Sequence, residues 1–242
     1  MIRITAFGSF YDRKMIKLIF FDLDNTLAPV GMPIPGDCLE KLNELYRKVK
    51  TAVCSGKPVS YLNGFARQAG LPDLIMCGEN GLTYQFGSDL PPALSGHFPV
   101  EKEILASLED VKNGFSAHFE GKYWCQKNEY AFTPFPFDET DFPPMTEYLK
   151  EKVKGTGLKV YYQPDCFDVL PDGIDKGSAL VNVCTILGID VGDTVTVGDH
   201  VNDYPMFERS GISVGISLPD KSRAKINVSS LGEAIDVINK LL

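Results

Sequence analysis

The chain has 242 residues, and its 44% of hydrophobic and 23% of charged residues are ordinary for a globular protein. Its formal net charge of −8 argues against a nucleic-acid partner or an anionic membrane, because Lys and Arg are not in excess to neutralise phosphate groups. The apolar runs are too short to span a membrane, and the six scattered cysteines include no Cys-x-x-Cys pair, so we expect a cytoplasmic protein with reduced cysteines.

The first residues, 1–14, lack the apolar core of a signal peptide, and with Met15 as an alternative start they are expected to be an N-terminal extension. Beyond them, buried strands and amphipathic helices alternate. Apolar runs at 18–21, 51–54 and 74–77 are typical of strands buried on both faces, and helical patterns lie between them at 39–49 and 62–69. This alternation predicts a parallel sheet with helices on its faces.

Residues 82–171 are richer in aromatic residues and prolines than the preceding part of the chain, and apolar and polar residues alternate along them. We expect antiparallel strands at 115–119, 123–126, 130–133, 158–162 and 167–170, with a helix from about 141 to 153. The segment is therefore predicted to be a compact α+β domain that is inserted into the first domain.

The parallel pattern returns after this insert. It predicts a helix at 176–187, strands at 194–197, 212–214 and 225–228, and a closing helix at 231–242. The predicted fold class is thus α/β. A Rossmann-like parallel-sheet core, formed by residues 15–81 and 172–242 with helices on both faces, carries an α+β cap formed by residues 82–171.

Four loops that follow strands or open helices carry acids, hydroxyls and a lysine. They contain Asp22, Asp24 and Thr26, then Ser55, Gly56 and Lys57, then Lys176, and finally Asp199, Asn202 and Asp203. Because ligands collect at the carboxyl ends of the strands in an open parallel sheet, we expect these loops to converge. Taken singly, Asp199 and Asp203 are also typical of a helix cap, and Lys176 is typical of a solvated helix start. The occurrence of all these residues together with Asp22, Asp24 and Thr26 favours an active site.

In order and spacing, these loops resemble the four motifs of the haloacid dehalogenase-like phosphatases, and the resemblance covers nearly the whole chain after Met15. It implies Mg²⁺-dependent hydrolysis of a small phosphate ester through an aspartyl-phosphate intermediate. Asp22 would be the nucleophile, and Asp24 would protonate the leaving oxygen and later deprotonate water. Lys176 would offset the charge of the nucleophile and the phosphate together.

The resemblance also assigns the ligands of the metal and of the substrate. Mg²⁺ would be held by the carboxylates of Asp22 and Asp199 and by the backbone carbonyl of Asp24, while Asp203 would support the metal or hold Lys176. The expected substrate-binding residues are Thr26, Ser55, Gly56, Lys57, Asn80 and Asn202 in the core and Lys127 and Asp168 in the cap. Family members often carry Arg in place of Lys57, and Lys is not equivalent to Arg in bidentate phosphate contact.

The insert lies between the second and third motifs, where sugar-phosphate phosphatases carry a large α+β cap, so a sugar phosphate is the expected substrate. Residues 79–82 and 167–173 also resemble the phosphomannomutase branch, which makes a sugar phosphomutase the first alternative. The compact loop at 198–203 favours the hydrolase.

A regulatory phospho-acceptor domain is less favoured, since such domains are much shorter and do not need an acid like Asp24. The expected partner is a small phosphate ester, and the protein is expected to be a monomer or a homodimer.

Overall fold

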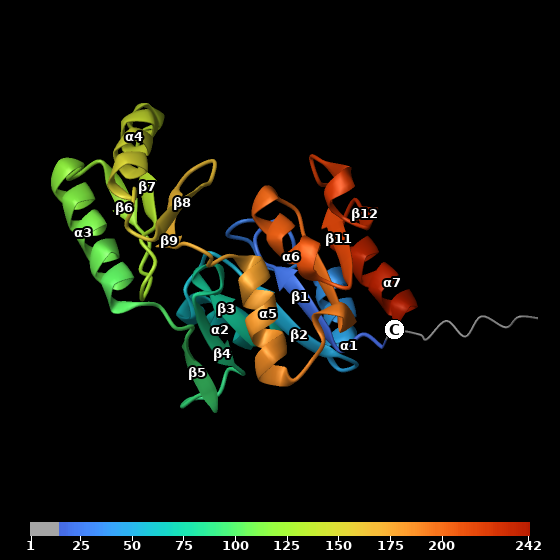
Figure 1. The fold of residues 1–242 in the computed structure, drawn as a ribbon. Coiled ribbons are helices and arrows are strands. Elements are labelled where there is room, and N and C mark those ends of the chain that lie inside the picture. Colours follow the sequence, from blue (N-terminus) through green and yellow to red (C-terminus); the bar gives the residue numbers. More distant parts are fainter. Residues whose placement is uncertain (1–14) are drawn as a thin grey trace, which may run out of the picture.

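The computed structural model describes residues 15–242, so the predicted extension at 1–14 lies outside the described part of the chain. An eight-stranded sheet runs through the larger part of the fold (Figure 1). In sheet order its strands are β12 (Ile226–Val228), β11 (Ile212–Ile216), β10 (Thr194–Gly198), β1 (Leu18–Asp22), β2 (Lys50–Cys54), β3 (Ile75–Gly78), β4 (Thr83–Phe86) and β5 (Leu94–His97). The pairings from β12 to β3 are parallel, and those of β3 with β4 and of β4 with β5 are antiparallel. The predicted α/β class is confirmed.

Helices cover both faces of this sheet because β1 is apolar on both sides. Leu18 and Phe20 pack in one cluster with the helices α5 (Lys176–Leu187) and α6 (Tyr204–Arg209). Ile19 and Phe21 pack in the opposite cluster with α1 (Gly36–Tyr46), α2 (Val59–Ala69) and α7 (Leu231–Leu241). Successive side chains of a strand point to opposite faces, so this run of four apolar residues suits a central strand. The packing fixes β1 between β10 and β2 and leaves Asp22 at its carboxyl end.

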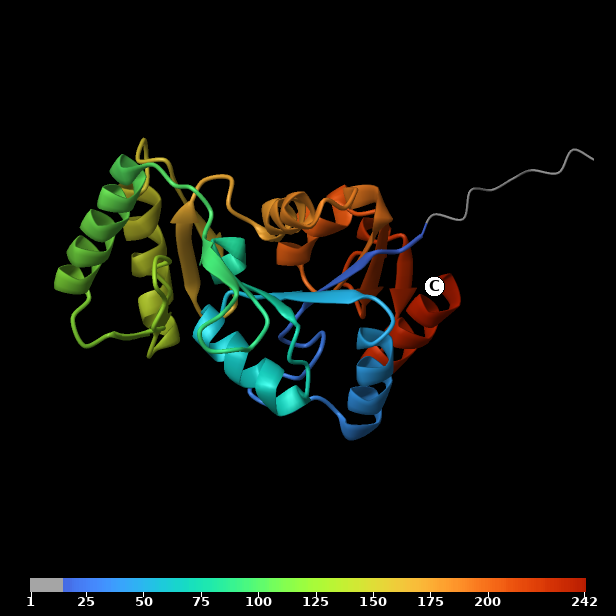
Figure 2. The same ribbon diagram turned by 90° about the horizontal axis from the view of Figure 1, so that it is seen from below.

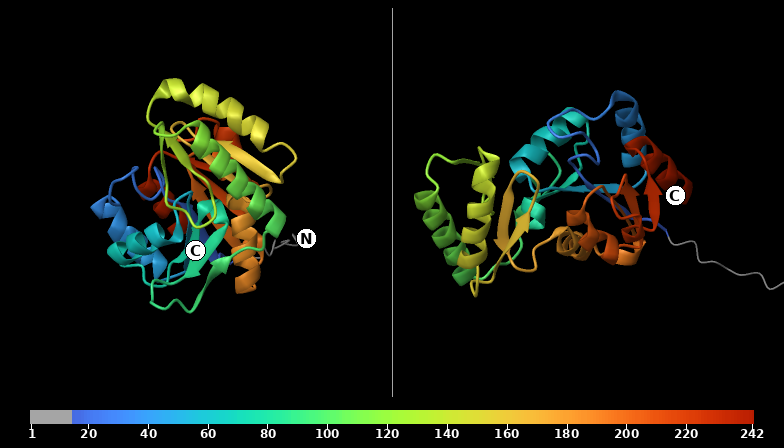
Figure 3. Two further views of the ribbon diagram at one scale, coloured as in Figure 1. Left: turned by 90° about the vertical axis from the view of Figure 1, so that its left-hand side faces the viewer. Right: turned by 90° about the horizontal axis from the view of Figure 1, so that it is seen from above.

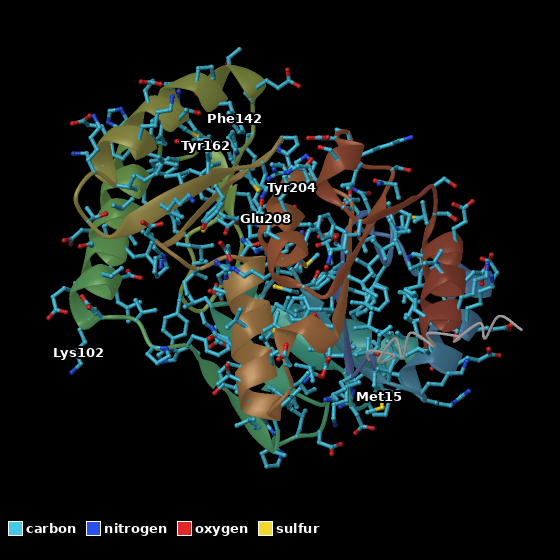
Figure 4. All side chains as sticks on the ribbon, turned by 45° about the vertical axis from the view of Figure 1, so that its right-hand side comes forward. Met15, Lys102, Phe142, Tyr162, Tyr204 and Glu208 are labelled. Atoms are coloured by element: carbon cyan, nitrogen blue, oxygen red, sulfur yellow. The ribbon has the colours of Figure 1, made fainter. Side chains whose placement is uncertain are left out.

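Residues 102–171 of the inserted segment contain two helices and four short strands. They are α3 (Lys102–His118), β6 (Tyr123–Cys125), β7 (Pro134–Pro136), α4 (Phe142–Lys152), β8 (Leu158–Tyr162) and β9 (Phe167–Pro171). The strands form two antiparallel pairs, β6 with β7 and β8 with β9. Both helices lie on the side of the segment that faces away from the large sheet (Figures 2 and 3). In Figure 4, Lys102 marks the start of α3 and Phe142 the start of α4.

Two strands predicted inside this segment are wrong. Residues 115–119 belong mostly to α3, whose Leu108, Val111 and Phe115 are buried at spacings of three and four residues. Such spacing places side chains on one face of a helix, and it decided the local structure against the short aromatic alternation. Residues 130–133 form no ladder; Phe132 only makes an isolated bridge with Val169, and the strand that pairs with β6 comes directly afterwards, as β7.

The large sheet extends further along the chain than predicted. Strands β4 and β5 add to its β3 edge, so residues 83–97 join the core sheet although they were placed in the cap. The chain reverses at Glu79–Gly81, where Asn80 has φ +56°, and this tight turn makes β4 antiparallel to its neighbour. The division into a core and a cap otherwise stays a prediction. Within the described residues, no helix combines the length and the apolar character needed to cross a membrane.

Candidate active site

A buried lysine lies between two buried carboxylates at the carboxyl end of β1. The Nζ atom of Lys176 is 2.5 Å from Oδ1 of Asp22 and 2.6 Å from Oδ1 of Asp203. Asp22 is the last residue of β1 and Lys176 is the first residue of α5, which begins with a capping box made by Asp175 and Ser178. The cap fixes where the helix begins, and with it the position of Lys176. Two of the predicted catalytic residues are therefore in direct contact.

The third member, Asp203, holds the loop that follows β10. Its Oδ2 atom accepts hydrogen bonds from the backbone N–H groups of Asp199 (2.9 Å) and His200 (3.0 Å), while its Oδ1 atom faces Lys176. A side chain at Gly198 would clash with the carboxylate of Asp203, so glycine is required there. With both oxygens engaged, Asp203 supports Lys176 and the loop, and it does not line the cavity described below.

Carboxylate oxygens of Asp22, Asp199 and Asp203 all lie within 4.8 Å of one another. Oxygen donors of this kind are the ligands that Mg²⁺ prefers, so the donor set fits the expected ion. Thr26 does not line the cavity; its Oγ1 atom donates to Oδ1 of Asp199 at 3.2 Å and orients that carboxylate. The side chain of Asp24 is directed elsewhere, with Oδ2 at 3.3 Å from Nζ of Lys57. The side chain of Asp24 is therefore not part of this cluster, and its backbone carbonyl stays the expected ligand of Mg²⁺.

The electrostatics of the cluster favour a bound cation. Burial raises the pKa of Asp22, the ammonium of Lys176 opposes this shift, and the neighbouring Asp203 and Asp199 add to it. The pKa of Asp199 is raised by burial and by Asp203. Burial alone would lower the pKa of Lys176, but the carboxylates of Asp203 and Asp22 outweigh it and hold the pKa above its ordinary value. One lysine thus faces three acids, and a divalent ion would balance the excess negative charge.

A cavity of about 390 Å³ opens above this cluster, between the sheet edge and the inserted segment. Its core-side lining consists of Asp22, Asp24, Asn25, Val30, Ser55, Gly56, Lys57, Asn80, Lys176, Asp199, His200 and Asn202. The inserted segment contributes Gln126, Thr133, Phe135, Gln163, Pro164, Asp165, Cys166 and Asp168. Among the residues that the structure describes, Oδ1 of Asn202 is one of two buried side-chain polar atoms without a hydrogen-bond partner, which leaves it free to meet a ligand.

The predicted cap residues differ in where they lie. Asp168 lines the cavity, but both of its oxygens are engaged, Oδ1 by Thr133 at 2.8 Å and Oδ2 by Asn80 at 3.0 Å. Lys127 is exposed and does not line the cavity. Its neighbour Gln126 does, and Nε2 of Gln126 donates to the backbone carbonyl of Gly56 at 2.8 Å. In this loop it is therefore Gln126, and not Lys127, that reaches the site.

Glu79 is a further residue that the sequence analysis did not single out. Its carboxylate is fully buried and accepts backbone N–H groups from Glu129 (2.9 Å), Tyr130 (3.0 Å) and Ala131 (2.6 Å). The contact joins the turn after β3 to the loop between β6 and β7. The sequence marked this position by a charged residue directly after a buried strand and by the resemblance of residues 79–82 to the phosphomannomutase branch, but it did not indicate the partners of Glu79.

Comparisons with known proteins bear on the family and the fold of the chain. A family model described as haloacid dehalogenase-like hydrolase matches residues 112–222. A phosphoglycolate phosphatase from Methanoculleus marisnigri is 26% identical over 209 residues, which cover 84% of each chain. A solved haloacid dehalogenase-like hydrolase from Bacteroides thetaiotaomicron superposes with a TM-score of 0.73 at 18% identity, covering 92% of this chain and 99% of that one. A sugar phosphatase of haloacid dehalogenase subclass IIB gives 0.69 at 16% identity, covering 93% and 100%.

Proposed function

Because this chain belongs to the haloacid dehalogenase-like hydrolases, we propose that it is a Mg²⁺-dependent phosphatase that hydrolyses a sugar phosphate or a similar small monoester. The reaction would pass through an aspartyl-phosphate at Asp22. The observation that carries this proposal is the contact of Lys176 with Asp22, both of which line the cavity, and with the buried Asp203. A carboxylate that is held beside a buried cation, at the carboxyl end of a central strand, is placed to attack a phosphorus atom.

Phosphoryl transfer needs positioning and neutralisation of charge on the transferred group. Asp22, Asp199 and the backbone of Asp24 would hold Mg²⁺, which when bound neutralises the phosphate oxygens. Lys176 offsets the charge of Asp22 and keeps its carboxylate in one orientation. On the other side of the cavity, Ser55 and Gly56 would receive the phosphate oxygens.

Asp24 is suited to move a proton at the leaving oxygen. It lies two residues beyond Asp22 and lines the same cavity, and the ion pair with Lys57 holds its Oδ2 atom at 3.3 Å. Protonation of the departing alkoxide and later deprotonation of water are complementary tasks that one carboxyl group can perform in turn. Closure of the cap over the site would exclude bulk water from the first step.

The test is turnover of p-nitrophenyl phosphate and of hexose phosphates by the full chain, before and after removal of metal. Dialysis against EDTA should abolish the release of inorganic phosphate, and added Mg²⁺ should restore it. Full turnover in a sample verified to be free of metal would contradict the proposal. Conversion of a hexose phosphate into an isomer without net release of phosphate would instead favour the phosphomutase.

A further inference from the structure

The two sides of the cavity differ in charge. Of the described residues that line it, those from the inserted segment include two carboxylates, Asp165 and Asp168, and no Lys, Arg or His. The remaining cap-side groups are amides, a hydroxyl, a thiol and the apolar surfaces of Phe135 and Pro164. The phosphoryl group would bind at the core, so this cap side is where the rest of the substrate must lie.

The two lysines that line the cavity, Lys57 and Lys176, each form an ion pair with a carboxylate of the core. Lys176 is buried between Asp22 and Asp203. Lys57 lies 3.3 Å from Asp24, and its charge also helps to lower the pKa of Asp168, which burial otherwise raises. A second anion on the substrate would therefore compete with Asp24 for Lys57 and with Asp22 and Asp203 for Lys176, and on the cap side it would face Asp165 and Asp168.

An aromatic ring forms part of the same wall, and a second ring packs against it. Phe135 lines the cavity, and Trp124 lies directly opposite it in the β6–β7 pair, with ring centroids 5.4 Å apart. The Trp124 side chain is 51% exposed. The face of an aromatic ring carries partial negative charge, so it accepts C–H surfaces and disfavours carboxylates.

From these three observations we propose that the cap side of the cavity selects an uncharged leaving group and rejects one that carries a carboxylate. The proposal rests on the phosphatase function proposed above and narrows its substrate class to phosphate esters of neutral alcohols. A carboxylate placed there would lose its hydration without gaining a cation, and it would lie near two like charges. We expect this to lower kcat/KM by roughly tenfold or more, since like-charge juxtaposition in an interface is costly.

A matched pair of esters tests the selection. Glycerol 3-phosphate and 3-phosphoglycerate have the same chain length and differ at the far carbon, which is a hydroxymethyl group in one and a carboxylate in the other. With Mg²⁺ near neutral pH, kcat/KM should favour glycerol 3-phosphate roughly tenfold or more. Asp165→Asn should shift this ratio toward 3-phosphoglycerate by roughly threefold at low salt and by less at high salt, because Asp165 is exposed. Glu120→Gln removes an exposed cap charge that does not line the cavity and should leave the ratio as it is.

Binding can be measured without turnover. The chain has a single tryptophan, Trp124, whose contact with Phe135 makes its emission a reporter of the cavity wall. In the Asp22→Asn protein with Mg²⁺, glycerol 3-phosphate should bind roughly tenfold more tightly than 3-phosphoglycerate.

Equal kcat/KM for the two esters, or equal affinity in this titration, would overturn the proposal while turnover of p-nitrophenyl phosphate leaves the phosphatase function intact. If no ester is hydrolysed, including p-nitrophenyl phosphate, the phosphatase function fails, and the titration alone decides the charge selection.

Discussion

Replacement of Lys176 by methionine should destabilise the protein far more than loss of an ordinary ion pair. The lysine and its two partner carboxylates are almost fully buried. The side chains are 2% exposed in Lys176, 6% in Asp22 and 0% in Asp203. Methionine fills the volume but leaves both carboxylates without a cation. Breaking a buried pair by removing one partner costs about 3–5 kcal/mol, because the remaining charge is uncompensated.

For a chain of this size, each kcal/mol lowers the melting temperature by about 2–4 °C, so Lys176→Met should lower it by roughly 6–20 °C. The measurement is thermal unfolding of metal-free protein, followed by circular dichroism. Lys41→Met is the matched control, since Nζ of Lys41 also contacts a carboxylate, that of Asp236, at 2.9 Å, but the two side chains are 44% and 53% exposed. Exposed pairs of this kind contribute little, so the control should unfold almost as the parent does.

The loss of thermal stability in Lys176→Met should also depend on pH. Removing the ammonium of Lys176, which lowers the pKa of Asp22, leaves that pKa higher in the variant than in the parent. A carboxyl group whose folded-state pKa lies above its unfolded value destabilises the fold as the pH rises through that interval. In the parent that pKa is already raised to about 8, so the two proteins differ in the charge of Asp22 only above this pH, and the difference between their melting temperatures should grow as the pH rises beyond it. Equal, small shifts for Lys176→Met and Lys41→Met, independent of pH, would refute the reasoning.

Two further substitutions probe the supports of the site. Gly198→Ala should displace Asp203 and reduce phosphatase turnover at least tenfold, whereas Gly64→Ala, where an added Cβ meets nothing within 4 Å, should leave turnover unchanged; steady-state kinetics of both proteins would decide this. Glu79→Gln replaces an acceptor of three backbone N–H groups and should weaken the contact by about 2 kcal/mol, seen as faster amide hydrogen exchange at residues 129–131. Unchanged exchange there would mean that Glu79 does not hold this loop.

The core of the site was predictable because a parallel sheet brings the carboxyl ends of its strands to one edge. The buried run at 18–21 identified β1, and Asp22, Lys176 and Asp199 follow from loops at that edge. Local pattern was sufficient here, since the period of the apolar residues and the capping signals agreed with the final packing.

The cap was less predictable because its contacts depend on how two parts of the chain meet. Phe115 packs on the same helix face as Val111, yet the short aromatic run around it also suits a strand, and only the complete apolar stripe of α3 decides between them. Gln126 reaches Gly56 and Glu79 reaches the loop at 129–131 across long distances in sequence, and no local pattern encodes such pairings. For the same reason Lys127, one residue from Gln126, was expected in the cavity but lies outside its lining.

The central claim, that Asp22 accepts the phosphoryl group, is tested most directly by mass spectrometry of acid-quenched protein. The Asp24→Asn variant keeps the carboxylate of Asp22 but lacks the group proposed to activate water, so a phosphorylated enzyme should accumulate when substrate and Mg²⁺ are added. The peptide that contains Asp22 should then gain the mass of one phosphoryl group, and the same peptide from the double variant Asp22→Asn, Asp24→Asn should gain none. An unmodified Asp22 peptide at every quench time, in Asp24→Asn protein that still releases the alcohol from its ester, would contradict the account.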